Sequence, residues 1–240
     1  MEYIILAAGV GTRLYPYTKN TPKCLVRLSE GETIIERAVR LITEYDKSAH
    51  VTVVVGFEEE KIKDTLGKKY PCTYVFNPFY RVTNSVASLW FAKDILTKGQ
   101  PVTILNGDIV FSRELAKVIT TPKQEDTIYY DSSIHSNGDY NVLELDGQMV
   151  VMGKELEDYS GEYVGITQYT PEGAKVLCQE IDEMVSDGLY DQWYENGLVQ
   201  LTLMMKNRYA VMDVCEYQWS EIDSIGNLLK INQIIKGDNR

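Results

Sequence analysis

Apolar runs and amphipathic segments alternate through the first 130 residues of the chain. Short apolar or β-branched runs are typical of buried strands, and segments whose apolar residues recur every three or four positions are typical of helices. The predicted strands are 3–8, 51–55, 73–76, 101–105 and 127–130, and the predicted helices are 33–45, 58–66, 85–96 and 112–119. This alternation predicts an α/β fold with a parallel sheet covered on both faces.

The pattern changes after residue 131. Asp146-Gly147 is a strong turn signal between two extended runs, so we expect a β-hairpin there. The later predicted strands are 141–145, 148–152, 162–169 and 209–214, and the later predicted helices are 171–184, 198–206 and 224–235. Since no linker composition separates the two parts, we expect a single domain over residues 1–240, with the second half laid on one edge of the sheet.

A glycine-rich turn follows the first predicted strand. The chain reads Leu-Ala-Ala-Gly-Val-Gly-Thr-Arg-Leu over residues 6–14 and Pro-Lys-Cys-Leu over residues 22–25. Because Gly9 and Gly11 lack a Cβ and tolerate positive φ, backbone N–H groups can approach phosphate oxygens closely. Arg13 and Lys23 would neutralise the phosphate charge. The turn is neither a Walker A loop nor a dinucleotide fingerprint, since Leu14 stands where the latter has its third glycine.

Three carboxylates are candidate metal ligands. Open parallel sheets bind ligands beyond the carboxyl ends of their strands, so Asp108, which follows the strand at 101–105, should share a rim with the glycine turn. In an extended segment residues two apart face the same side, so Glu221 and Asp223 can both point into the cleft. Oxygen ligands suit Mg²⁺. The alternatives are that Asp108 is only a turn residue and that Asp223 only caps the following helix.

Composition limits the classes of partner. The net charge is −11, which argues against nucleic acid or an anionic membrane as the main partner. The four cysteines form no Cys-x-x-Cys pair and are expected to be reduced. Met1 leads directly into a predicted strand and no apolar run approaches membrane-spanning length, so we expect a cytoplasmic protein without a signal peptide. His50 and His135 lie outside every motif, which leaves no Ser-His-Asp or zinc set.

The glycine turn together with Pro-Lys-Cys-Leu resembles the signature of the nucleotidyltransferases that make nucleoside-diphosphate sugars and alcohols. Residues 83–92 resemble the Thr-Asn…Ser-Leu-x-x-Ala segment of the cytidylyltransferases that act on phosphocholine and on 2-aminoethylphosphonate, and residues 153–155 and 160–166 extend the match. The resemblance implies a Rossmann-like, doubly wound, mostly parallel sheet with an added β-hairpin and helical acceptor-side elements. Residues 1–131 would then be the nucleotide-binding half, and residues 132–240 would add the acceptor-binding elements and a C-terminal helix.

The resemblance also implies roles for individual residues. Arg13 and Lys23 would be the catalytic cations, and Lys154 would meet the acceptor phosphate. The residues expected to contact the nucleotide are Leu6, Ala8, Gly9, Gly11, Asn84, Ser88 and Gly107. The metal ligands would be Asp108, Glu221 and Asp223.

The chain is rich in aromatic residues, with 17 tyrosines and three tryptophans. Aromatic faces beside carboxylates suit a cationic amine or quaternary ammonium group. The residues considered for this role are Tyr80, Trp90, Tyr140, Tyr190 and Trp193, the carboxylate Asp139, and above all Glu162, Tyr163, Glu195 and Trp219. The alternative is that most of these aromatic side chains only pack in the core or lie on the surface.

These features predict a Mg²⁺-dependent cytidylyltransferase that transfers CMP from CTP to a small phosphorylated or phosphonate acceptor and releases pyrophosphate. A homodimer is left open. One alternative is a sugar-1-phosphate nucleotidyltransferase that uses UTP or dTTP, against which the missing Gly/Ala-rich segment counts. The other is a catalytically silent regulatory domain of the same fold, against which the joint presence of Arg13, Lys23, Asp108 and Asp223 counts.

Overall fold

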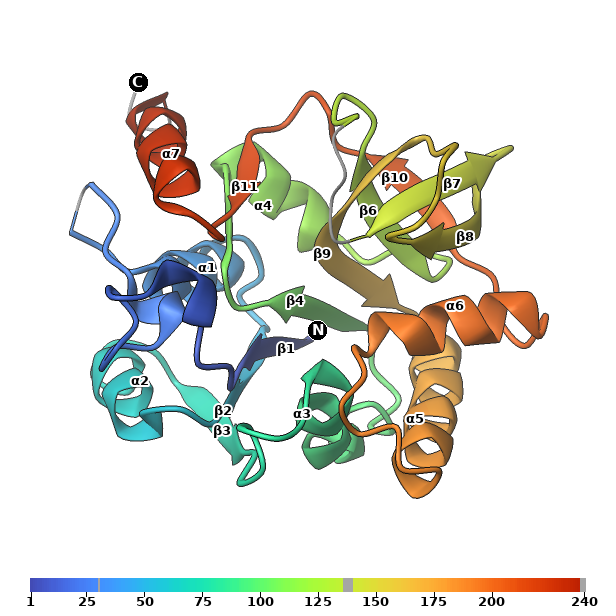
Figure 1. Cartoon of the computed structure of the whole chain (residues 1–240), viewed down its shortest axis with the longest axis horizontal. Coiled ribbons are helices and arrows are strands. Elements are labelled where there is room, and N and C mark those ends of the chain that lie inside the picture. The colour runs from blue at the N-terminus through green and yellow to red at the C-terminus, as the bar shows by residue number, and fades with distance from the viewer. Residues whose placement is uncertain (30, 136–139, 238–240) are drawn as a thin grey trace.

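A central sheet flanked by helices organises the molecule, as the computed structural model of residues 1–29, 31–135 and 140–237 shows, with side chains described through residue 231 (Figure 1). The strands are β1 (Glu2–Ala7), β2 (His50–Val55), β3 (Cys72–Phe76), β4 (Val102–Asn106), β5 (Ile109–Phe111), β6 (Thr127–Asp131), β7 (Asn141–Leu145), β8 (Gln148–Gly153), β9 (Gly161–Tyr169), β10 (Ala210–Asp213) and β11 (Trp219–Glu221). The helices are α1 (Ile34–Tyr45), α2 (Glu59–Leu66), α3 (Ser85–Phe91), α4 (Arg113–Ile119), α5 (Pro171–Ser186), α6 (Glu195–Leu203) and α7 (Ile225–Gly237).

The first four strands lie side by side and are parallel to one another. Among the described residues the sheet has the order β3-β2-β1-β4-β9-β6-β10-β8-β7, so β1 lies between β2 and β4. The chain runs outward from β1 in both directions, which makes the β1–β4 boundary the point where the strand order reverses. A ligand crevice is expected beyond the carboxyl ends of these two strands.

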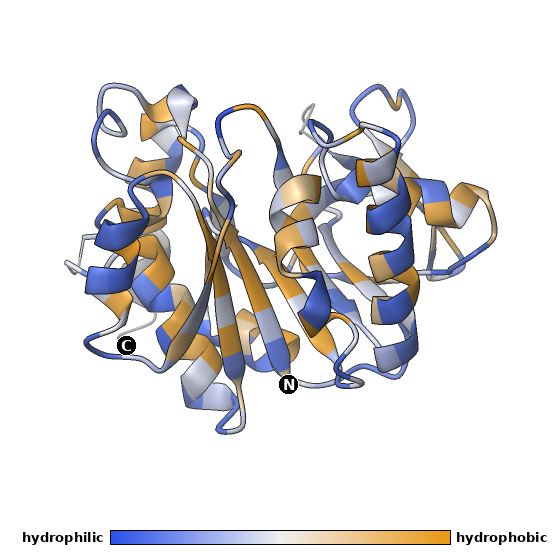
Figure 2. Cartoon of the chain, turned by 90° about the horizontal axis from the view of Figure 1, so that it is seen from below, coloured by the Kyte–Doolittle hydropathy of each residue, from blue (hydrophilic) through white to orange (hydrophobic). Residues whose placement is uncertain are grey.

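Apolar side chains cover both faces of the sheet, as Figure 2 shows by the orange strands between two sets of helices. Successive residues of a strand point to opposite faces. Ile4 accordingly belongs to the cluster beneath α3 and α5, and Ile5 belongs to the cluster beneath α1, α2 and α4. The expected α/β architecture with both faces covered is confirmed.

The middle of the sheet differs from the simplest expectation. Strand β9 lies between β4 and β6 and is antiparallel to both. Beyond β6, strand β10 is parallel to it, β8 and β7 follow, and β7 pairs again with β9, so five strands form a ring. Hydrophobic patterning identifies a strand but not its neighbour, because the neighbour is chosen by long-range packing.

Several local expectations can be compared with the structure directly. The hairpin turn is confirmed, since Asp146 and Gly147 have φ values of 52° and 77°. The helix expected over 85–96 ends at Phe91 and is followed by a separate 3₁₀ turn, Lys93–Ile95. Strands β5 and β11 were not expected, because three residues are too few to show a periodic pattern. Within the described parts of the chain, no helix is both long and apolar enough to cross a membrane.

Candidate active site

The glycine turn lies directly after β1. Gly11 has a φ of 68°, and a Cβ added there would lie 2.8 Å from the Cβ of Lys23. The Thr18 hydroxyl donates to the Gly11 carbonyl at 2.6 Å and holds the turn closed. Gly9 differs from the expectation, because its φ is not in the positive range and a Cβ there would meet nothing within 4 Å. The backbone conformation of the turn therefore requires glycine at position 11, whereas the space beside Gly9 is unoccupied by other atoms of the described residues.

A two-stranded ribbon brings the three predicted carboxylates together. Strand β5 follows Asp108 immediately and pairs antiparallel with β11, with Ile109 opposite Glu221. The Ile222 N–H donates to the Asp108 carbonyl at 3.1 Å. As a result, carboxylate oxygens of Asp108, Glu221 and Asp223 lie within 4.8 Å of one another.

Two cations contact this cluster. Lys23 Nζ lies 2.5 Å from Asp108 Oδ2 and also bonds to Asp223 Oδ1. Arg13 Nη1 lies 2.6 Å from Asp223 Oδ2, and Arg13 Nη2 lies 4.0 Å from Glu221 Oε1. Burial lowers the pKa of Lys23, but Asp108 and Asp223 outweigh it and leave that pKa above its usual value. Lys23 is therefore positively charged at neutral pH.

The donor set fits a hard divalent cation. Burial, together with the negative charges of Asp108 and Asp223, raises the pKa of Glu221. Asp108 Oδ1 is buried and has no hydrogen-bond partner among the described residues. Three carboxylates in one cluster, one of them with an unpartnered buried oxygen, match the all-oxygen ligand preference of Mg²⁺.

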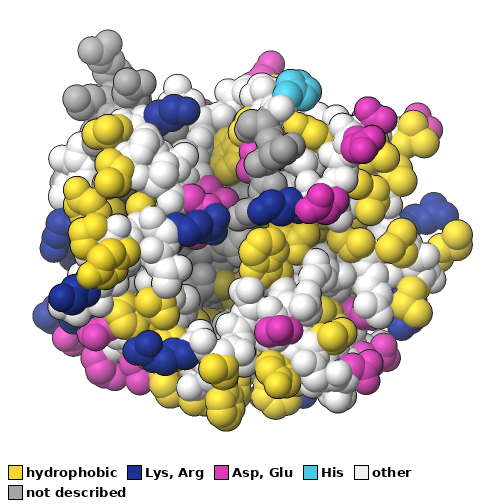
Figure 3. All heavy atoms as spheres, in the orientation of Figure 1, with side chains coloured by type: hydrophobic (Ala, Val, Ile, Leu, Met, Phe, Trp, Pro, Cys, Tyr) yellow, Lys and Arg dark blue, Asp and Glu magenta, His cyan; other side chains and the backbone are white. Residues whose placement is uncertain are grey.

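A cavity of about 320 Å³ opens over these groups. It is lined by the glycine turn, by the carboxyl ends of β1 and β4, by the start of α3 and by β9 and α6. Figure 3 shows the hollow near the centre of this face, with basic and acidic side chains at its rim. The predicted site residues that line it are Leu6, Ala8, Gly9, Gly11, Arg13, Lys23, Asn84, Ser88, Gly107, Asp108, Glu162, Tyr163, Glu195 and Glu221. Asp223 joins them through its bonds to Arg13 and Lys23.

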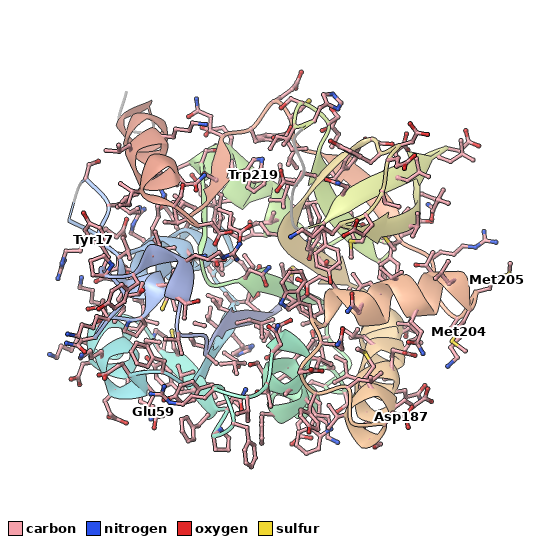
Figure 4. The ribbon with its side chains drawn as sticks, viewed as in Figure 1. Tyr17, Glu59, Asp187, Met204, Met205 and Trp219 are labelled. Carbon is pink, nitrogen blue, oxygen red and sulfur yellow. The ribbon has the colours of Figure 1, made fainter. Side chains whose placement is uncertain are left out.

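Other predicted residues lie elsewhere. Lys154 lines a neighbouring cavity of about 750 Å³, which shares Asn84, Tyr140 and Trp193 with the first. Met204, at the outer end of α6 in Figure 4, also lines that second cavity. Trp219, on β11 in Figure 4, lines neither cavity; its ring packs against the core and its Nε1 donates to Asp131 at 2.8 Å.

The remaining aromatic candidates divide between core, surface and site. Trp90 packs against the buried core and Tyr190 is exposed. Tyr80 lines the first cavity, and it packs closely against Gly56, where an added Cβ would lie 2.7 Å from the Tyr80 Cβ. Asp139 lies outside the described residues.

Glu195 is a buried carboxylate in the cavity wall, only 4% exposed. Its oxygens accept long hydrogen bonds of 3.4 Å from Ser85 Oγ and Asn106 Nδ2. Burial raises the pKa of Glu195 to about 7. A carboxylate so weakly satisfied is available to a hydrogen-bond donor or a cation of the ligand.

Sequence reasoning did not identify Thr83, Ser85 and Asn106 as lining residues. Asn106 ends β4, opposite Leu6 of β1, so the rule that ligands bind at carboxyl strand ends would have found it. Thr83 and Ser85 flank Asn84, which caps α3, and they lie in the segment 83–92 that resembles the cytidylyltransferases, a signal that could have found them.

Comparisons with known proteins identify the family of the chain. The model of the nucleotidyl transferase family matches residues 2–151. The chain is 27% identical to the CTP:phosphoglutamine cytidylyltransferase of Campylobacter jejuni, over 95% of this chain and 98% of that protein. It is 29% identical to the 2-aminoethylphosphonate cytidylyltransferase of Lancefieldella rimae, over 94% of this chain and 89% of that protein.

The fold is also that of a solved structure. The CTP:phosphocholine cytidylyltransferase of Streptococcus pneumoniae superposes with a TM-score of 0.80 at 23% identity, covering 98% of each chain. This likeness confirms the Rossmann-like α/β fold class. The match of the family over more than half of the sequence, on a chain that places the loop, the cations and the carboxylates in one cavity, shows that the protein is an enzyme that belongs to the nucleotidyl transferase family.

Proposed function

We propose that the enzyme transfers CMP from CTP to a small acceptor that carries a phosphate or phosphonate group, and releases pyrophosphate. One observation carries the proposal: the glycine turn, Lys23 and the three carboxylates converge in the cavity at the carboxyl ends of β1 and β4. The two relatives reported above are named cytidylyltransferases, and the acceptors in their names are a phosphorylated and a phosphonate compound. These names support CTP as the nucleotide.

The reaction needs positioning and charge neutralisation more than proton transfer. An oxygen of the acceptor phosphate attacks the α-phosphorus of CTP and forms the new P–O bond. The bond from the α-phosphorus to the oxygen bridging to the β-phosphorus breaks, and pyrophosphate leaves with the electron pair. Since the attacking oxygen is already ionised at neutral pH, no histidine or other base is required. Arg13 and Lys23 would offset the negative charge that develops on the departing group.

The metal site would belong to the same machinery. Asp108, Glu221 and Asp223 would hold Mg²⁺, which when bound supplies positive charge to the triphosphate. In the structure Lys23 and Arg13 balance these carboxylates, so the cluster keeps its shape. Asp108 and Asp223 are then shared between a cation of the chain and the metal.

The acceptor would extend from the first cavity toward the second. Lys154 would meet its phosphate, and Glu162 and Glu195 offer carboxylates near the rings of Tyr140 and Trp193, whose centroids lie 5.2 Å apart. This combination of charge and aromatic surface favours an acceptor with an ammonium group. Phosphocholine, phosphoethanolamine and 2-aminoethylphosphonate have this character.

The test is a pyrophosphate-release assay with each of the four nucleoside triphosphates against a panel of acceptors. We expect CTP to be preferred and the three ammonium acceptors to exceed hexose 1-phosphates. A preference for UTP or dTTP with hexose 1-phosphates would instead support the sugar-1-phosphate alternative and reject the cytidylyltransferase assignment.

A further inference from the structure

The second cavity borders the pair of aromatic rings proposed to meet the acceptor. It lies between the end of β8 and one side of α6, which passes beside β8 in Figure 1. Its volume of about 750 Å³ is in the range of small-molecule sites, about 300–1,000 Å³. Because Tyr140 and Trp193 line both cavities, a ligand in contact with their rings lies at the junction of the two.

A chain of hydrogen bonds runs along the wall of the second cavity beside these rings. The Tyr140 hydroxyl lies 2.7 Å from Asn196 Oδ1, and Asn196 Nδ2 lies 2.9 Å from Gln192 Oε1. Gln192 Nε2 in turn lies 3.3 Å from Asp191 Oδ1. Because an ionised carboxylate can only accept, the Gln192 NH₂ group faces Asp191 and its oxygen accepts from Asn196. The Asn196 oxygen then accepts from Tyr140, so the direction of every bond in the chain is fixed.

This direction determines what the two amides offer to a ligand. An amide nitrogen has two hydrogens, and the chain uses one hydrogen of Gln192 and one of Asn196. In the described part of the protein, no further side-chain hydrogen bond uses the second N–H of either amide. Both side chains are half-buried and line the second cavity. The wall beside the ring pair therefore presents N–H donors.

The first cavity offers the opposite chemistry. Glu162 and Glu195 line it and do not line the second cavity, so a cationic group is favoured on that side and an anionic group is repelled. The second cavity also contains Asp191, which is exposed and accepts from an amide, and Lys154. A ligand with both charges would turn its ammonium group toward the first cavity and its carboxylate toward the amide donors of the second.

We infer that the second cavity binds a carboxylate of the acceptor, so that the acceptor is the phosphate or phosphonate of an amino acid; this rests on the proposed function. The proposed contacts of the acceptor phosphate with Lys154 and of its ammonium group with the rings leave the amide donors unused. A carboxylate on the carbon that carries the ammonium group lies directly beside it, within reach of these donors. Hydrogen bonds to an ionised acceptor are the stronger kind. Gln192 and Asn196 are then specificity-determining residues.

Two matched pairs of acceptors differ only in this carboxylate. O-Phosphoserine is phosphoethanolamine with a carboxylate on the carbon that bears the nitrogen, and 2-amino-3-phosphonopropionate is related to 2-aminoethylphosphonate in the same way. With CTP and the wild-type enzyme, we expect kcat/KM to be at least about tenfold higher for the carboxylate-bearing member of each pair, as for a hydrogen bond to a charged group.

Two variants test the amide wall. Gln192→Met keeps the length of the side chain and removes its N–H groups, so the ratio of kcat/KM within each pair should fall about tenfold. Asn196→Asp keeps an oxygen for the Tyr140 hydroxyl and places negative charge where an N–H group was, so the ratio should fall further. Gln124→Met, in an exposed bend that lines neither cavity, should match the wild type. Thermal melts check that each variant is folded.

The outcomes separate this inference from the proposed function. If the wild type makes no distinction within the pairs, or prefers the members without the carboxylate, the inference is rejected and the cytidylyltransferase proposal stands. The inference is also rejected if the wild type prefers the carboxylate-bearing members but Gln192→Met and Asn196→Asp both keep its ratio. A preference for UTP or dTTP with hexose 1-phosphates would reject the proposed function itself.

Discussion

Lys23 joins parts of the site that are far apart in the sequence, since its ammonium group bonds to Asp108 and to Asp223. We expect Lys23→Ala to lower kcat/KM at least a hundredfold, because removing a preorganised charge from such a site commonly costs about 3 kcal/mol. Steady-state kinetics and a thermal melt would measure this. Lys19→Ala, an exposed lysine on the same loop, is the matched control. A variant that melts far lower but keeps its kcat/KM would make Lys23 structural only.

The buried carboxyl of Glu195 gives the protein a pH-dependent stability. Burial raises its pKa from an ordinary value of 4.5 to about 7, so the folded protein holds this proton more tightly than the unfolded chain does. Stability is therefore lost as the pH rises between these two values, by about 3 kcal/mol at most. Glu195→Gln cannot ionise and should escape the loss.

Melting temperatures of the wild type and Glu195→Gln, measured from pH 5 to pH 8, test this. We expect the melting temperature of Glu195→Gln, relative to that of the wild type, to increase steadily as the pH rises. Glu157→Gln, a substitution of an exposed carboxylate, should show no such trend. A constant difference between Glu195→Gln and wild type across this range would show that Glu195 does not carry the raised pKa.

At the scale of elements, the β5–β11 ribbon is decisive for the site. Each strand has three residues, and the pairing of Ile109 with Glu221 is what places Asp223 beside Asp108. The sequence predicted that the glycine turn and Asp108 would share a rim, because carboxyl strand ends meet there. It could not predict the ribbon itself, since so short a pair has no periodicity and its pairing depends on contacts between residues far apart in the sequence.

Helix boundaries show the same limit. The start of α1 is set by neighbouring residues: the Thr33 side chain accepts from the Glu36 N–H, and the Glu36 side chain accepts from the Thr33 N–H. The predicted helix over 33–45 agrees with this start. The start of α6 has no side-chain cap, and the prediction placed that helix three residues too late. Glu195 lies in the first turn of α6. The sequence predicts its position near the acceptor but does not place it on this helix.

The turn after β8 carries Lys154 into the second cavity. We expect Lys154→Ala to raise the KM for the acceptor about tenfold while the affinity for CTP changes less than twofold, because Lys154 does not line the first cavity. Calorimetric titration of CTP and initial rates at varied acceptor concentration measure the two effects. An equal loss of CTP and acceptor affinity would contradict this division of the two cavities.

At the scale of the whole molecule, the protein is strongly acidic, with a net charge of −11, yet it is proposed to bind a polyanion. Two basic side chains, Arg13 and Lys23, lie at the loop, and the carboxylates beside them would repel a triphosphate unless a metal intervenes. Binding of CTP should therefore depend on Mg²⁺ far more than it would in a basic cleft.

Thermal melts can measure this dependence. Mg²⁺ and CTP together, at 100 times their apparent Kd, should stabilise the folded protein by about 2.7 kcal/mol, a shift of about 5–10 °C for a chain of this size. CTP with EDTA should shift the melt much less. Asp108→Asn should lose the part of the shift that requires Mg²⁺, and an undiminished shift in that variant would remove Asp108 from the proposed metal site.

The position of β9 limits how this enzyme can be divided. Residues 161–169 fill the space between two strands that precede them in the chain, β4 and β6. A fragment that ends at residue 131 would expose the edges of β4 and β6 that β9 covers. The remaining fragment, residues 132–240, would lack the strands with which β9 pairs. Recombination could therefore not exchange residues 132–240 for another segment without also replacing the strand that completes the sheet of residues 1–131. Residues 1–131 and 132–240 must therefore be inherited together, although each segment contributes its own side chains to the cavity lining.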